Sequence, residues 1–123
     1  MEYSAEVRRR FAAAAGTLPG QDAQYVGEAE DRSLNFWVRF RMRTAEGVIE
    51  HIDYAVFGCP DSVAAADLVT ERLRGCPLES AFGIDMHAVA AELDMPVEKI
   101  GKLLRIEDAV RNCAQQAQLA MSE

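Results

Sequence analysis

The chain has 123 residues, of which 50% are apolar and 27% are charged, and its formal net charge is −7. This length predicts one domain that buries its own hydrophobic core without the help of disulfides or structural metals. The negative charge argues against general binding to nucleic-acid phosphates, and no apolar run approaches the roughly 20 residues that a membrane span needs.

The first 20 residues predict a helical arm. Tyr3 to Ala15 are helix formers with one apolar stripe, and the breaker Thr17-Leu18-Pro19-Gly20 follows them. We therefore expect an arm over residues 1–20 that packs on a single domain over residues 21–123.

The next segment has the two-residue period of β-strands. Tyr25–Ala29 is a weak strand candidate, and Leu34–Arg43 alternates apolar with polar or aromatic residues. A turn at Ala45-Glu46-Gly47 leads into a returning strand over Val48–Phe57. The pattern predicts a three-stranded antiparallel meander with one apolar face and one face that carries arginines, Trp37 and acids.

The remaining sequence predicts helices. Glycines, prolines and the 3.6-residue period divide it into segments at about 61–74, 77–82, 85–93, 97–100 and 103–119. A sheet followed by helices predicts an α+β fold, in which a three-stranded antiparallel sheet has helices packed on one face.

Cys59 is the most distinctive residue, because it lies where the last strand meets the first long helix. Free amides and the helix dipole at such a corner favour a thiolate. Pro60 suits the first helical position, and we expect Asp61 and Ser62 to bind other free amides. The alternative is that Cys59 is a small buried hydrophobe.

The other residues with reactive or metal-binding side chains have simpler interpretations. Three cysteines without a C-x-x-C pair indicate free thiols, and without the hydrophobic segment of a signal peptide we expect a cytoplasmic protein. We expect Cys76 to be a linker residue, Cys113 to be buried and inert, His51 to be exposed and His87 to be structural. Since no nucleophilic triad, phosphate loop or carboxylate dyad is present, the sequence does not predict an enzyme.

Several short phrases in order resemble one family. The segment from Val26 to about Ala114 resembles the IscU/NifU N-terminal domains, the scaffolds on which iron–sulfur clusters are assembled. The resemblance rests on Ala45–Glu50, Phe57-Gly58-Cys59, Ala64-Ala65-Ala66, Leu68–Glu71, Arg74-Gly75, Pro77–Ala81, Ala90–Leu93 and Ile106–Ala109. It implies an IscU-like fold of the SufE/NifU type.

The resemblance also implies three cysteines that hold a nascent cluster, since thiolates are soft anionic ligands for iron. Cys59 matches the middle cysteine. The expected Cys-Gly-Asp phrase reads Asp31-Arg32-Ser33, so that Asp31 replaces the thiol and Ser33 the acid. Gly101 and Lys102 stand where a histidine and the third cysteine are expected.

These replacements leave Cys59 and Asp31 as the metal-ligand candidates. Lys102 repels a metal and is expected to pair with Asp31 or with the Cys59 thiolate. We therefore expect a polar cluster of Asp31, Cys59 and Lys102. The phrase Met95–Lys99 also departs from the proline motif that a dedicated Hsp70-type chaperone recognises in this family.

The function implied by the resemblance is cluster assembly. Cys59 would receive persulfide sulfur from a cysteine desulfurase, iron or an iron–sulfur cluster would be held transiently, and the chaperone would be a further partner. One alternative is a divergent paralogue that binds a desulfurase or chaperone as an adaptor or regulator without building clusters. Others are zinc or iron held by Cys59, Asp31 and a histidine, no cofactor at all, or a neighbouring chain that supplies the missing thiols.

Overall fold

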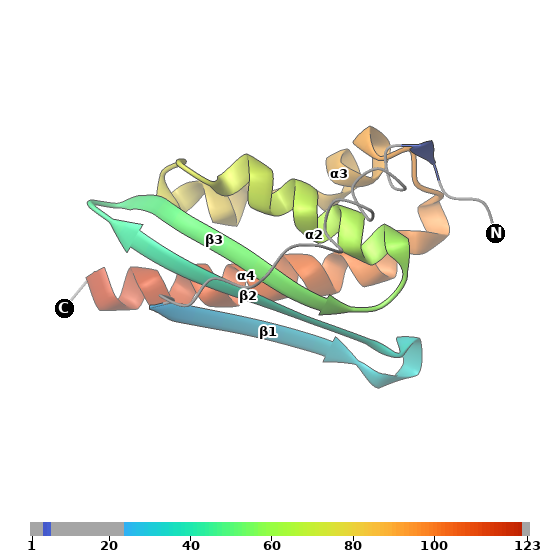
Figure 1. Cartoon of the computed structure of the whole chain (residues 1–123), viewed down its shortest axis with the longest axis horizontal. Coiled ribbons are helices and arrows are strands. Elements are labelled where there is room, and N and C mark those ends of the chain that lie inside the picture. Colours follow the sequence, from blue (N-terminus) through green and yellow to red (C-terminus); the bar gives the residue numbers. More distant parts are fainter. Residues whose placement is uncertain (1–3, 6–23, 122–123) are drawn as a thin grey trace.

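The computed structural model describes residues 4–5 and 24–121 (Figure 1). The arm predicted over residues 1–20 therefore lies outside the described residues, apart from Ser4 and Ala5. The Ser4 hydroxyl donates a hydrogen bond to the Leu93 carbonyl at 2.6 Å.

Three antiparallel strands form the sheet in the order β1-β2-β3. They are β1 (Tyr25–Asp31), β2 (Phe36–Ala45) and β3 (Val48–Phe57), with a 3₁₀ turn η1 (Arg32–Leu34) between the first two. The meander is as predicted, but Leu34 is not in a strand. It belongs to η1, and Asn35 follows in the left-handed conformation with φ 52°, so the extended chain begins only at Phe36.

The side chains of β2 divide cleanly between the two faces of the sheet. Phe36, Val38, Phe40 and Met42 are buried against the helices. Trp37 and the alternate arginines lie half-buried on the opposite face, where the Arg39 guanidinium stacks 5.0 Å from the Trp37 ring centre. The predicted apolar and polar faces are confirmed for this strand.

The pairing of β2 with β3 contains one irregularity. Arg43 pairs with His51 and Thr44 pairs with Ile49, which leaves Glu50 as an extra residue in β3. Because this bulge shifts the alternation, both Ile49 and Ile52 are fully buried, although they are three residues apart.

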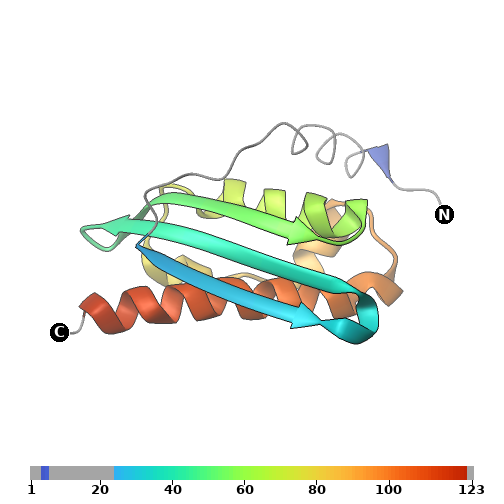
Figure 2. The ribbon, with the colours of Figure 1, turned by 60° about the horizontal axis from the view of Figure 1, so that its bottom comes forward.

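The helices follow the sheet in sequence and cover one of its faces (Figures 1 and 2). Two long helices are joined by three shorter ones: α2 (Pro60–Leu73), η2 (Leu78–Gly83), α3 (Met86–Glu92), η3 (Val97–Lys99) and α4 (Ile100–Met121). The predicted α+β fold is confirmed. In the part of the chain that the structure describes, no helix is long and apolar enough to cross a membrane.

The last helix starts earlier than expected. The sequence predicts two separate helical segments, at residues 97–100 and from about residue 103. In the structure α4 begins at Ile100, directly after η3. Lys102 is therefore a helical residue in the first turn of α4.

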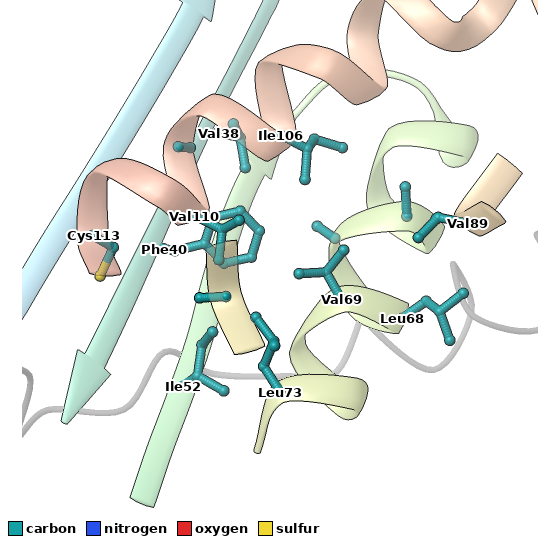
Figure 3. Close-up of a cluster of buried hydrophobic side chains, with 14 of the residues drawn as sticks. Val38, Phe40, Ile52, Leu68, Val69, Leu73, Val89, Ile106, Val110 and Cys113 are labelled. Carbon is teal, nitrogen blue, oxygen red and sulfur yellow. The ribbon is translucent and has the colours of Figure 1, made fainter. Parts of the chain in front are cut away.

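The core lies between the sheet and the two long helices. Phe40, Ile52, Val69 and Val110 are fully buried, and Figure 3 shows them in one cluster with their neighbours. This core fixes α2 and α4 relative to the end of β3.

One glycine allows β1 to approach α4. A Cβ atom at Gly27 would lie 2.3 Å from the Ala109 carbonyl oxygen and 2.5 Å from the Cys113 backbone nitrogen. Cys113 is fully buried at this contact, as predicted, and burial raises the pKa of its thiol to about 12. The thiol therefore stays protonated near neutral pH and is inert as a nucleophile.

Candidate functional site

Cys59 is the N-cap residue of α2. Its backbone is extended, with φ −84° and ψ 168°, and Pro60 follows at the first helical position. Its carbonyl accepts hydrogen bonds from the backbone N–H groups of Ser62 at 3.0 Å and Val63 at 3.2 Å. The side chain, which makes no capping hydrogen bond, is half-buried. The predicted corner between strand and helix is present.

Two polar side chains contact the Cys59 sulfur. Ser62 is fully buried and places its Oγ 3.5 Å from Cys59 Sγ. Lys102 reaches across from α4 and donates from its Nζ to the same sulfur, also at 3.5 Å. The site is thus a thiol, a hydroxyl and an ammonium group on the first turns of two helices.

These neighbours change the acidity of Cys59. Burial of the thiol opposes its ionisation, but the hydrogen bonds with Ser62 and the positive charge of Lys102 outweigh this effect. The pKa of Cys59 therefore lies below its ordinary value. Near neutral pH a larger fraction of Cys59 is therefore in the thiolate form, which is the nucleophilic one, than of an unperturbed cysteine.

A second contact lies beside the first, between Lys99, the last residue of η3, and Asp61 at the start of α2. Lys99 Nζ is 3.0 Å from Asp61 Oδ2, and the two side chains are only 11% and 5% exposed. We expected Asp61 and Ser62 to bind free amides, but their side chains contact Lys99 and Cys59 instead. The sequence contains a signal for this arrangement, since Lys99 and Lys102 are three residues apart, which is close to one turn of a 3₁₀ or α-helix.

Asp31 pairs with a different cation. Its carboxylate accepts from the Ser33 hydroxyl at 2.5 Å and from the Ser33 backbone N–H at 3.1 Å, and it lies 4.0 Å from Arg105 Nε. The hydrogen bond from the Ser33 hydroxyl is the main cause that lowers the pKa of Asp31. Of the expected cluster of three residues, the structure shows the contact between Cys59 and Lys102. Asp31 instead interacts with Arg105, one helical turn further along α4.

The remaining candidates have other surroundings. Gly101 is exposed, with open space around it. The imidazole of His51 is half-exposed, with Nε2 3.1 Å from Asp53 Oδ2 on the sheet face turned away from the helices. His87 is exposed on α3, and its structural role stays a prediction. Cys76, in the linker after α2 as predicted, donates to the Arg72 carbonyl at 3.1 Å.

The donor set around Cys59 does not fit an iron–sulfur cluster held by one chain. The polar side chains that contact the sulfur are a hydroxyl and an ammonium group, and an ammonium repels a cation. Across residues 4–5 and 24–121, no three His, Cys, Asp or Glu side chains gather where they could hold one metal ion. What the pair can do is stabilise an anion on sulfur.

Comparison with known proteins identifies the family. The model of the NifU-like N-terminal domain matches residues 2–119. The chain belongs to the NifU-like N-terminal domain family. Curated relatives include the iron–sulfur cluster assembly scaffold protein IscU of Escherichia coli K12, which is 36% identical over 66 residues, 54% of this chain and 52% of the relative.

A relative with a longer match is iron sulfur cluster assembly protein 1, mitochondrial, of Schizosaccharomyces pombe. It is 31% identical over 99 residues, 79% of this chain and 52% of the relative. This NifU-like chain thus spans about half the length of the curated relatives it matches.

Solved structures agree on the fold. A putative iron–sulfur cluster assembly scaffold protein for the SUF system from Fervidobacterium islandicum AW-1 superposes with a TM-score of 0.72 at 14% identity, over 91% of this chain and 96% of that one. The N-terminal part of a nitrogen-fixing NifU-like protein from Brucella abortus gives 0.67 at 15% identity, over 92% and 95%. Together with the family match, these structures confirm the predicted resemblance and fold, while the roles of individual site residues stay predictions.

Proposed function

We propose that this protein acts in iron–sulfur cluster assembly by accepting persulfide sulfur at Cys59 from a cysteine desulfurase. The observation that carries the proposal is the contact between Lys102 Nζ and Cys59 Sγ at the N-terminus of α2. Membership in the NifU-like family supports the setting, since its named relatives are cluster assembly proteins. In this role the protein receives sulfur and does not itself catalyse a reaction.

The transfer is a thiol–persulfide exchange. The Cys59 thiolate attacks the outer sulfur of the donor's cysteine persulfide, a new S–S bond forms on Cys59, and the donor cysteine leaves as a thiolate. Atoms and charge balance without an oxidant or reductant. The rate depends on the thiolate fraction of the attacking cysteine, which the lowered pKa of Cys59 increases.

Lys102 contributes before and after the exchange. Its ammonium group stabilises the attacking thiolate, and afterwards it stabilises negative charge on the new persulfide. In the resemblance, Lys102 occupies the position of the third cluster thiolate. We therefore propose that sulfur acceptance is the step this chain retains, and that cluster iron, as cargo, is bound where other thiolates are available.

The second candidate is an adaptor that binds a desulfurase or chaperone without accepting sulfur. Lys102 also favours this adaptor function, because a lysine beside the one matched cysteine makes the site unsuitable for a metal ion. The two functions differ in whether Cys59 is needed for chemistry or is dispensable for binding.

One experiment separates them. The protein is incubated anaerobically with a cysteine desulfurase and cysteine, and persulfide is located by mass spectrometry of differentially alkylated peptides. The proposal expects one added sulfur on Cys59, none after Cys59→Ser, and no loss after the matched control Cys76→Ser. If Cys59 gains no sulfur while Cys59→Ser still binds the desulfurase, the adaptor function replaces the proposal.

A further inference from the structure

We propose that Asp61 and Lys99 are positioning residues, whose buried ion pair holds the first turn of α4 against α2 and thereby keeps the Lys102 ammonium group at the Cys59 sulfur. The inference rests on the proposed function only in treating Cys59 as the reacting group. The Asp61–Lys99 pair takes no part in the sulfur transfer itself, and its role is to position Lys102.

Two parallel contacts connect the same two segments. Asp61 follows Cys59 by two residues at the start of α2. Lys99 is the last residue of η3, and it precedes Lys102 in the first turn of α4 by three residues. Lys99 meets Asp61 at 3.0 Å, and Lys102 meets Cys59 at 3.5 Å. Since three residues are nearly one helical turn, fixing one lysine in place also fixes the direction of the other.

The burial of the Asp61–Lys99 pair makes it a strong constraint. Its side chains are 5% and 11% exposed, whereas the ion pair between Arg105 and Asp108 on the surface of α4 is 47% and 56% exposed. A buried charge that loses its partner is strongly destabilising, while an exposed pair contributes little. Movement of this segment away from α2 would therefore separate the buried Asp61 carboxylate from the Lys99 ammonium group.

The hydrophobic core contacts the first turn of α4 on one side only. The first fully buried residue of the helix is Leu103, while Gly101 is exposed with no neighbouring atoms within 4 Å of where its Cβ would lie. Ile100 is only partly buried. Core packing therefore holds this turn at Leu103, and the Lys99 contact is a polar anchor just before the turn begins.

A purely electrostatic role for the pair predicts a different result. In that case Lys99 would only neutralise the Asp61 carboxylate, which otherwise repels a thiolate two residues away. Asp61→Asn would then make Cys59 more reactive. If the pair positions Lys102, Asp61→Asn makes Cys59 less reactive, because the anchor is lost.

The test measures the rate of Cys59 alkylation by iodoacetamide at pH 7, with mass spectrometry resolving Cys59 from Cys76. Lys99→Met and Asp61→Asn are each made in the parent and in a Lys102→Met background. We expect each to slow Cys59 by roughly threefold to tenfold in the parent, the size of a coupling between neighbouring residues. In the Lys102→Met background we expect neither to slow it further.

The controls separate positioning from loss of structure. The Cys76 rate in the same sample reports whether the fold is intact, and Arg105→Met removes an α4 cation that faces Asp31 instead. Lys99→Arg keeps the positive charge and serves if Lys99→Met does not fold, with a Cys59 rate within about twofold of the parent expected for a retained ion pair.

The proposal is overturned if Asp61→Asn speeds Cys59 alkylation, if Lys99→Met slows it equally without Lys102, or if neither substitution changes it. Alkylation needs no desulfurase. A failure here is therefore distinct from a failure of persulfide acceptance, which the incubation with desulfurase measures separately.

Discussion

Lys102 Nζ lies 3.5 Å from Cys59 Sγ, although 43 residues separate the two in the chain. One residue caps α2 and the other lies in the first turn of α4, so the contact exists only because both helices pack on the same face of the sheet. The pair places a positive charge beside the one cysteine that the resemblance matches to a cluster ligand.

Lys102→Met is expected to raise the pKa of Cys59, because the thiolate loses the ammonium group that stabilises it. The pH at which half of Cys59 is ionised, followed by its alkylation rate across pH, should move upward. At neutral pH the rate should fall. Arg105→Met, one turn further along, is the control and should leave the midpoint unchanged. An unchanged midpoint in Lys102→Met would show that Ser62 alone sets the acidity.

Asp31→Asn is expected to leave Cys59 reactivity unchanged. The ion-pair partner of Asp31 is Arg105 rather than Lys102, so its charge does not act on the sulfur through that lysine. The same alkylation assay checks this, with Asp61→Asn as a substitution close to the sulfur for comparison. A marked change in Asp31→Asn would restore the cluster of three residues that the sequence predicts.

Gly27→Ala is expected to destabilise the fold by about 1–3 kcal/mol, the usual cost of overpacking. The new methyl group would lie 2.3 Å from the Ala109 carbonyl oxygen, which is backbone and cannot rotate away. Gly83→Ala is the matched control, because no atom lies within 4 Å of its added methyl group. Urea unfolding measures both. Equal stability of the two variants would contradict the close approach of β1 to α4.

The folded protein is expected to lose stability at high pH because of the buried Cys113 thiol. Burial raises the pKa of its thiol to about 12 in the folded protein, above the ordinary value of 9.0. The unfolded chain therefore loses this proton first. The contribution to stability is complete below pH 9.0 and disappears as pH rises from there toward about 12.

The slope of that loss is at most about 1.4 kcal/mol per pH unit for one proton. Urea unfolding at neutral pH and at pH 10 checks it, with Cys113→Ala expected to lose stability less steeply. Cys76→Ala is the control and should follow the parent. A parent and a Cys113→Ala variant with the same pH dependence would contradict the prediction.

Much of the fold could be predicted from local patterns. Phe36–Arg43 alternates with a two-residue period, the later segments have the helical period, and glycines and prolines separate them. The meander and its helices can therefore be predicted nearly to their ends. The errors come from backbone conformations that alternation does not report. Asn35 takes a left-handed conformation that delays β2, and the bulge at Glu50 brings both Ile49 and Ile52 into the core.

The sequence by itself determined the position of Cys59, because a strand followed by Cys-Pro and a helical period defines a strand–helix corner within a few residues. It left open which cation Cys59 meets. Only the tertiary structure decided that Lys102 faces the sulfur, that Asp31 faces Arg105 and that Lys99 is buried against Asp61. The physical reason is that a period reports which face of a helix is buried, whereas contacts between α2 and α4 depend on how two helices pack across a shared core.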